Sequence, residues 1–113
     1  MTMPGTENPQ DKYEIVARAL AEIIEEMKRI GYWQADPLPV EAYDFRLAFA
    51  ADTMSFEQWL RFVFVPRVNQ IIAEKGDFPS QSQVGTAALK NFDGDDKASK
   101  LVRMLNEFDA LFG

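Results

Sequence analysis

Residues 59–70 read WLRFVFVPRVNQ and form the most hydrophobic stretch of the chain. The apolar residues in it recur at steps of three and four, which predicts a helix with one buried face. Pro66 interrupts that pattern, and Arg67 follows it. A proline inside a helix removes one backbone hydrogen bond and pushes against the carbonyl four residues earlier, so we expect a bend at Pro66.

Three interpretations of Pro66 are open at this point. In the first, the bend lets a long helix wrap around a short core. In the second, it opens a concave surface on which Arg67 and the freed carbonyl of Phe62 meet a ligand or a partner. In the third, the segment divides into two separate helices. The first interpretation is favoured, because it requires nothing beyond packing.

Two long helices are predicted around this stretch. The later one begins after Ser55, which forms a capping box with Gln58, and continues to Gly76. The earlier one covers residues 9–30 and ends at Gly31, a residue type that suits the terminus of a helix. Each would span about 30 Å, which favours an elongated bundle.

The connection at residues 31–54 holds two prolines and five aromatic residues. A structureless connection of this length is unusual in a compact domain, so we expect it to be ordered against the core. Residues 40–51 form either a short helix or an irregular packed strap. Four aromatic side chains of the connection are predicted to be buried: Trp33, Tyr43, Phe45 and Phe49.

A weaker third helix is predicted over residues 81–92. It follows a turn at residues 77–80, and Ser80 with Gln83 provides a second capping box. Gly85 lies inside this helix and lowers its helical propensity.

The chain ends on a fourth helix, which Asp93 or Asp95 is expected to cap. The sequence therefore predicts an all-α, four-helix, mostly up-and-down bundle with a long ordered loop between the first two helices and a Pro-kinked second helix. Residues 1–8 are predicted to be a flexible tail and residues 9–113 a single domain. The predicted core consists of Val16, Leu20, Ile23, Met27, Trp59, Leu60, Val63, Val68, Ile71, Leu101, Leu105 and Phe108.

Composition excludes several classes of site. The chain has 113 residues, 47% hydrophobic and 27% charged, as is typical of a globular domain. It contains no cysteine and no histidine, so nucleophilic triads and zinc sites lack the group on which they depend. We expect no catalytic residue, no metal and no cofactor. An enzyme would have to rely on carboxylate, serine, lysine or tyrosine chemistry.

The net charge of -6 limits the kind of partner, and the hydrophobicity of the segments limits the location. Nucleic-acid binding draws much of its affinity from lysine and arginine, so direct nucleic-acid binding is not expected. No segment approaches the roughly 18 consecutive apolar residues of a membrane span, and the first residues do not resemble a signal peptide. We therefore expect a cytoplasmic protein that makes no membrane contact.

Charged residues raise three further hypotheses. Asp52 and Arg67 form a salt bridge that ties the connection to the long helix, or Arg67 binds an anion. Glu25 and Glu26 are neighbours that point in different directions on a helix, so both are interpreted as solvated surface or capping charges and not as a catalytic pair. The acidic run at residues 93–96 lacks the spacing of a calcium loop.

Four short motifs carry a family resemblance: Asp52-Thr53-Met54, Trp59-Leu60, Val65-Pro66-Arg67 and Phe108-Asp109-Ala110-Leu111-Phe112. Together they resemble the YqcC-like family of small bacterial proteins, over roughly residues 10–113. The resemblance implies a cytoplasmic bundle of helices with no established activity, often encoded beside tRNA pseudouridine synthase C. One departure is Val84-Gly85-Thr86-Ala87, where the family tends to have an apolar residue, a proline and an aromatic residue.

These observations favour a non-catalytic interaction module, accessory to tRNA pseudouridylation, that binds an unidentified protein partner. The alternative is a small-ligand or anion-binding protein with a pocket near Arg67, between the connection and the long helix. The helical stripes would also allow two copies of the chain to form a homodimer. The candidate partner or ligand surface consists of Trp33, Asp52, Trp59, Pro66 and Arg67.

Overall fold

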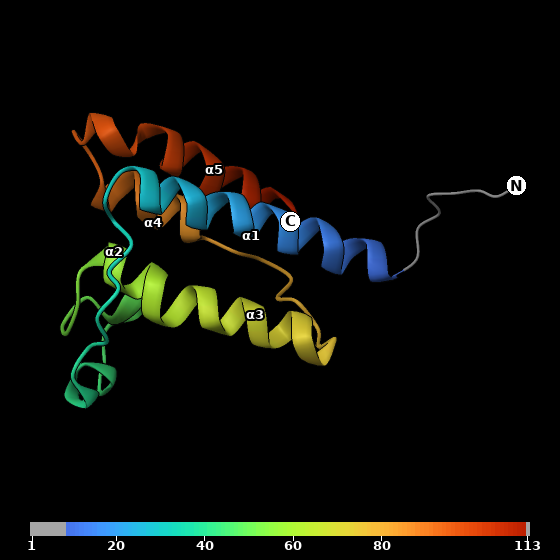
Figure 1. The fold of residues 1–113 in the computed structure, drawn as a ribbon, viewed down its shortest axis with the longest axis horizontal. Helices are drawn as coiled ribbons and strands as arrows, with labels where there is room; N and C mark the ends of the chain where they lie inside the picture. Colours follow the sequence, from blue (N-terminus) through green and yellow to red (C-terminus); the bar gives the residue numbers. More distant parts are fainter. Residues whose placement is uncertain (1–8, 113) are drawn as a thin grey trace, which may run out of the picture.

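The computed structural model describes residues 9–112, with side chains from residue 12, and contains four helices that alternate in direction (Figure 1). No strand is present within residues 9–112, so the predicted all-α, up-and-down bundle is confirmed. None of the helices in that range has the length and the apolar content to cross a membrane. The tail predicted at residues 1–8 lies outside the described residues. The helices are α1 (Pro9–Arg29), the continuous run of α2 (Phe56–Trp59), η3 (Leu60–Phe64) and α3 (Val65–Glu74), then α4 (Val84–Asn91) and α5 (Ser99–Ala110).

The core lies between the apolar faces of these helices. α5 packs against both α1 and α4, and α3 packs against α1. Every predicted core residue except Ile71 is buried, and Ile71 is half-buried. The spacing of apolar residues therefore predicts the buried face of each helix correctly, because burying those faces against one another is the main favourable contribution to folding.

The end of α1 follows the predicted glycine stop. Gly31 has a φ of 81°, in the left-handed region that glycine adopts without steric cost. The N–H of Tyr32 donates to the carbonyl of Met27, and the N–H of Gly31 donates to the carbonyl of Lys28. These two bonds form a Schellman motif, which satisfies carbonyls that the end of the helix leaves free.

The long second helix contains a π turn immediately before Pro66. Its start at Ser55 has the predicted capping box with Gln58. In η3 the N–H of Val65 donates to the carbonyl of Leu60, five residues earlier. The backbone stays right-handed helical from Trp59 through Val65, so the interpretation as two separate helices is wrong.

The π turn explains how the helix accommodates the proline. A wider turn gives the ring of Pro66 more room near the preceding carbonyls. It also allows three successive residues, Val63, Phe64 and Val65, to be buried together. In a regular α-helix successive residues point about 100° apart and rarely share one buried face.

The connection at residues 31–54 is an irregular strap with two short 3-10 turns, η1 (Val40–Tyr43) and η2 (Ala48–Ala50). Phe49 has a φ of 55° and Ala50 a φ of 53°, which are uncommon for residues other than glycine. The strap is closed on itself, because the hydroxyl of Thr53 donates to the carbonyl of Ala42 at 2.6 Å. The interpretation of residues 40–51 as an irregular packed strap is thus confirmed, and the alternative of a short helix over the whole segment is not.

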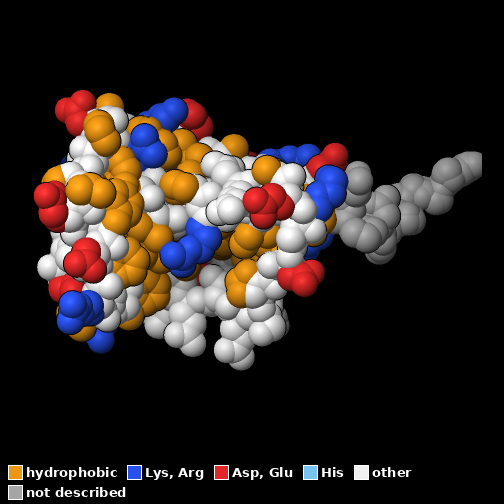
Figure 2. Space-filling view, turned by 90° about the horizontal axis from the view of Figure 1, so that it is seen from below, with side chains coloured by type: hydrophobic (Ala, Val, Ile, Leu, Met, Phe, Trp, Pro, Cys, Tyr) orange, Lys and Arg blue, Asp and Glu red, His pale blue; other side chains and the backbone are white. Residues whose placement is uncertain are grey.

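Part of the strap remains exposed. Trp33, Phe45 and Phe49 are half-buried, but Tyr43 is 45% exposed, so its predicted burial is wrong. Val40 and Leu47 are exposed as well. Figure 2 shows hydrophobic side chains gathered in a band across the end of the molecule that holds the strap.

The start of α4 differs from the prediction. The helix begins at Val84, and Gln83 before it makes no side-chain capping bond, so the predicted capping box with Ser80 is wrong. The carboxylate of Asp109 on α5 caps the helix instead: it accepts the N–H of Val84 at 3.1 Å and the N–H of Gly85 at 2.6 Å. A tertiary contact replaces the local cap.

The predicted aspartate cap of the last helix is also wrong. A short 3-10 turn, η4 (Asp96–Ala98), precedes α5, and no side chain caps either element. The carboxylate of Asp95 accepts a hydrogen bond from the hydroxyl of Tyr32 instead. This bond ties the end of α1 to the turn before α5.

Candidate functional site

An aromatic cavity that includes two of the predicted site residues lies between α3, the 77–83 connection and the end of α5. Its volume is about 460 Å³, and both Trp59 and Arg67 line it. We call it the Arg67 pocket. It does not lie between the strap and the long helix, where a pocket near Arg67 was predicted, because α3 turns this face towards α5 and the 77–83 connection.

A row of aromatic rings forms the wall of the Arg67 pocket. Trp59 and Phe64 are stacked with ring centres 5.7 Å apart, and Phe64 meets Phe108 edge-on at 5.3 Å. Phe108 continues to Phe112 at 5.1 Å, and Phe112 to Phe78 at 5.3 Å. Such contacts are favourable beyond the area they bury, so the pocket is built on a well-packed surface.

The edge of the pocket carries one cation and one anion. Arg67 and Asp77 both line the pocket and are both exposed. Among residues 12–112, no ion pair involves Arg67. Its guanidinium group is therefore free to form a bidentate contact with a carboxylate from outside the chain.

The salt bridge predicted between Asp52 and Arg67 is absent. The carboxylate of Asp52 accepts the backbone N–H groups of Arg46, at 3.0 Å, and Leu47, at 3.3 Å. The bond from Arg46 is the main cause that lowers the pKa of Asp52. Asp52 thus closes a loop of the strap, because backbone donors lie nearer in the chain than any arginine of the long helix.

Arg61 makes one tie between the strap and the long helix, and Gln58 makes another by donating to the side chain of Gln34 at 3.1 Å. The guanidinium carbon of Arg61 lies 4.2 Å from the centre of the Trp33 ring, and the Nε of Arg61 donates to the carbonyl of Gln34 at 3.0 Å. Trp33 is therefore a packing residue of the strap. Of the five predicted surface residues, Trp59 and Arg67 line the Arg67 pocket. Pro66, which precedes Arg67 in the sequence, is exposed but does not line the pocket, and neither Trp33 nor Asp52 lines it.

Glu26 corrects the interpretation of the adjacent glutamates. Its side chain is only 4% exposed, whereas that of Glu25 is 76% exposed. The Nε of Arg29 donates to Glu26 at 2.7 Å, and Lys100 from α5 lies 4.0 Å away. The hydrogen bond from Arg29 is the main cause that lowers the pKa of Glu26. One of the two glutamates is a buried anchor between α1 and α5.

The fold and the pocket define the class of protein: a small helical bundle that presents an aromatic pocket with an arginine at its edge. Residues 15–111 match the protein family described as DUF446: tRNA pseudouridine synthase C. The chain belongs to this family, and the resemblance inferred from its motifs is confirmed.

Two relatives are similar to parts of the chain. An uncharacterized protein of Haemophilus influenzae is 32% identical over 69 residues, which are 58% of this chain and 65% of that protein. A tRNA pseudouridine synthase C of Pectobacterium carotovorum subsp. carotovorum is 33% identical over 57 residues, which are 50% of this chain and 15% of that protein. The matched segments span less than two thirds of either relative. No solved structure matches the chain.

Proposed function

We propose that the chain is a non-catalytic accessory module of tRNA pseudouridylation in the bacterial cytoplasm, which binds the synthase. The observation that carries this proposal is the relative named tRNA pseudouridine synthase C. The same 57 residues are half of this chain and 15% of that relative, so the relative is more than three times as long. A segment similar to this chain is therefore part of a longer polypeptide with the synthase name.

Physical linkage supplies the reason to expect binding. Two modules in one polypeptide meet at a high effective concentration without needing a strong interface. When the modules are separate chains, an interface must provide that proximity. The charge of this chain supports such an interface, because an enzyme that binds tRNA needs a basic surface and this chain has a net charge of -6.

The Arg67 pocket is the surface that suits this task best. Interface hot spots are enriched in tryptophan, tyrosine and arginine around well-packed pockets. Here an exposed arginine stands at the edge of a cavity walled by Trp59, Phe64 and Phe108. We propose that the partner inserts an apolar side chain into the cavity and places a carboxylate against Arg67.

Binding of the purified synthase from the same organism tests the proposal. Isothermal titration calorimetry compares the wild-type chain with Arg67→Ala and with the control Arg18→Ala, an exposed residue that lines a different groove. We expect Arg67→Ala to weaken binding about tenfold or more, which corresponds to about 1.4 kcal/mol, and Arg18→Ala to have little effect. Absence of binding by the wild-type chain would overturn the proposal. An equal loss of affinity in both variants would show that the Arg67 pocket is not the surface that binds the synthase.

A second candidate function is binding of a small carboxylate at the same place. The cavity volume of about 460 Å³ lies within the range of small-molecule sites, roughly 300–1,000 Å³. A thermal-shift screen with aromatic and aliphatic carboxylates tests this function. A ligand that raises the melting temperature of the wild-type chain but not of Arg67→Ala would favour this function over a protein partner.

A further inference from the structure

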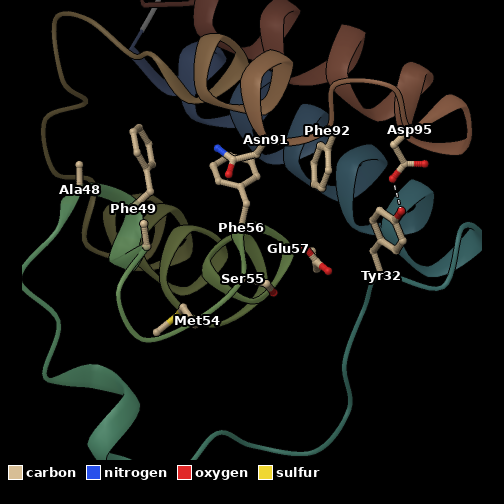
Figure 3. A pocket seen from close by; sticks show the side chains of 11 residues that line it. Tyr32, Ala48, Phe49, Met54, Ser55, Phe56, Glu57, Asn91, Phe92 and Asp95 are labelled. Atoms are coloured by element: carbon tan, nitrogen blue, oxygen red, sulfur yellow. Dashed lines mark hydrogen bonds between the residues drawn. The ribbon is translucent and has the colours of Figure 1, made fainter.

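A second cavity of about 480 Å³ lies at the start of the long helix (Figure 3). It is formed by Tyr32 after α1, the end of the strap, the first turn of α2 and the turn between α4 and α5. We call it the Tyr32 pocket. It shares no lining residue with the Arg67 pocket, so its chemistry is independent of the function proposed above.

The side chains of the Tyr32 pocket form an aromatic wall with an acidic end. The rings of Phe49, Phe56 and Phe92 follow one another along the pocket, and Tyr32 continues the row in Figure 3. Phe56 lies 5.8 Å from Phe49 and 5.4 Å from Phe92, measured between ring centres. Glu57, on the first turn of α2, lies at the Tyr32 end of the row.

The charged groups that line this pocket are both carboxylates, Glu57 and Asp95. The carboxylate of Asp95 accepts a hydrogen bond from the hydroxyl of Tyr32. This bond and the negative charges of both carboxylates raise the pKa of Tyr32. A cation of the chain already lies nearby, because the Nζ of Lys97 is 4.9 Å from the centre of the Tyr32 ring. The aromatic and acidic groups together make this region attractive to cations.

The geometry points to a site for an arginine side chain of a partner protein, whose guanidinium plane lies against the aromatic wall while its N–H groups donate to Glu57 and Asp95. Arginine fits better than lysine, because its charge is spread over a plane that stacks on aromatic rings and its donors match a carboxylate. The chain contains one such stack already, between Arg61 and Trp33 at 4.2 Å. Phosphate groups are disfavoured here, because both lining charges are negative.

A titration with a single-residue probe tests the site without any partner protein. N-acetyl-arginine methylamide is added to the isotope-labelled chain, and backbone amide shifts are followed by NMR. The citrulline counterpart has the same shape but no charge and serves as the matched probe. We expect the arginine probe to shift the amides of Glu57, Asn91 and Phe92 with a Kd of about 1–10 mM, and the citrulline probe to shift them at least fivefold less. Equal shifts from both probes, or no shift at these amides, would overturn the inference.

Variants then assign the site to the two carboxylates. Glu57→Gln and Asp95→Asn are each expected to weaken binding of the arginine probe at least threefold. Glu107→Gln, an exposed glutamate of α5, is the matched control and should leave the Kd unchanged. Asp95→Asn also alters the bond to Tyr32, whereas Glu57→Gln leaves that bond in place. An unchanged Kd in Glu57→Gln would therefore contradict the site even if Asp95→Asn fails to fold. Neither result bears on synthase binding, which is measured with Arg67→Ala.

Discussion

The backbone N–H of Gly85, at the start of α4, donates a 2.6 Å hydrogen bond to the carboxylate of Asp109 on α5. The same carboxylate accepts the N–H of Val84 and the hydroxyl of Ser82. It therefore satisfies donors that the first turn of any helix leaves free. A side chain on the last helix caps the helix before it, and the two elements depend on each other.

We predict that Asp109→Ala destabilises the chain by about 1–2 kcal/mol, the usual cost of losing a helix cap. The reason is that two backbone N–H groups and one hydroxyl lose their acceptor together. Urea unfolding followed by circular dichroism measures the change. Glu107→Ala, exposed on the same helix, is the control and should stay within about 0.5 kcal/mol of the wild-type chain. Equal losses would show that Asp109 does not act as the cap.

Gly85 provides a second test of the contact between α4 and α5. A Cβ atom at this position would lie 2.6 Å from the Cα of Asn106, which is closer than real contacts allow. Helix propensity alone predicts that Gly85→Ala stabilises the chain by about 1 kcal/mol. Overpacking against a backbone atom predicts a loss of about 1–3 kcal/mol, and we expect this loss. Thermal unfolding distinguishes the two, because the melting temperature of Gly85→Ala rises in the first case and falls in the second. The exposed Thr86→Ala is the control on the same helix.

Local patterns in the sequence were sufficient for most of the fold. The capping box at Ser55 and the glycine at Gly31 each act within a few residues, so their outcome depends little on the rest of the chain. The predicted cap at Ser80 failed because a tertiary carboxylate was available, that of Asp109. No pattern in a single sequence shows that residues 84 and 109 meet.

The site was predicted less completely than the fold. Trp59 and Arg67 lie in the same helical stretch, so their appearance in one pocket follows from helix geometry. Phe78 and Phe112 were missed, because they reach the pocket from segments whose arrangement depends on packing. Asp52 was predicted to pair with Arg67 of the long helix, yet the backbone N–H groups of Arg46 and Leu47, six and five residues earlier in the chain, donate to its carboxylate instead.

The bond between Tyr32 and Asp95 predicts a loss of stability in alkaline solution. The hydrogen bond to Asp95 is the main cause that raises the pKa of Tyr32 to about 12. A tyrosine in the unfolded chain ionises near pH 10. The contribution of the Tyr32–Asp95 bond to the free energy of unfolding is therefore fully present below about pH 10 and is lost as the pH rises towards 12. We expect the free energy of unfolding to fall more steeply over this range in the wild-type chain than in Tyr32→Phe. Urea unfolding at several pH values measures the two slopes.

Tyr43→Phe is the control for the alkaline experiment, since Tyr43 is 45% exposed and lies outside the Tyr32 pocket. Its slope should match that of the wild-type chain. Parallel curves for the wild-type chain and Tyr32→Phe would mean that the phenol of Tyr32 keeps an ordinary pKa in the folded state. The bond to Asp95 would then be too weak to hold the turn before α5.

Glu26 predicts the opposite dependence in acid. The hydrogen bond from Arg29 lowers the pKa of Glu26 in the folded chain. The ionised carboxylate of Glu26 therefore adds to the free energy of unfolding above the pKa of a glutamate in the unfolded chain, about 4.3, and this contribution is lost as the pH falls through the pKa of Glu26 in the folded chain. We therefore expect Glu26→Gln to be less stable than the wild-type chain at pH 7, and the difference to shrink as the pH falls below about 4. Glu25→Gln, at a side chain that is 76% exposed, should change stability little at either pH. A difference between Glu26→Gln and the wild-type chain that is constant with pH would show that shape alone, and not the charge of Glu26, joins α1 to Lys100 on α5.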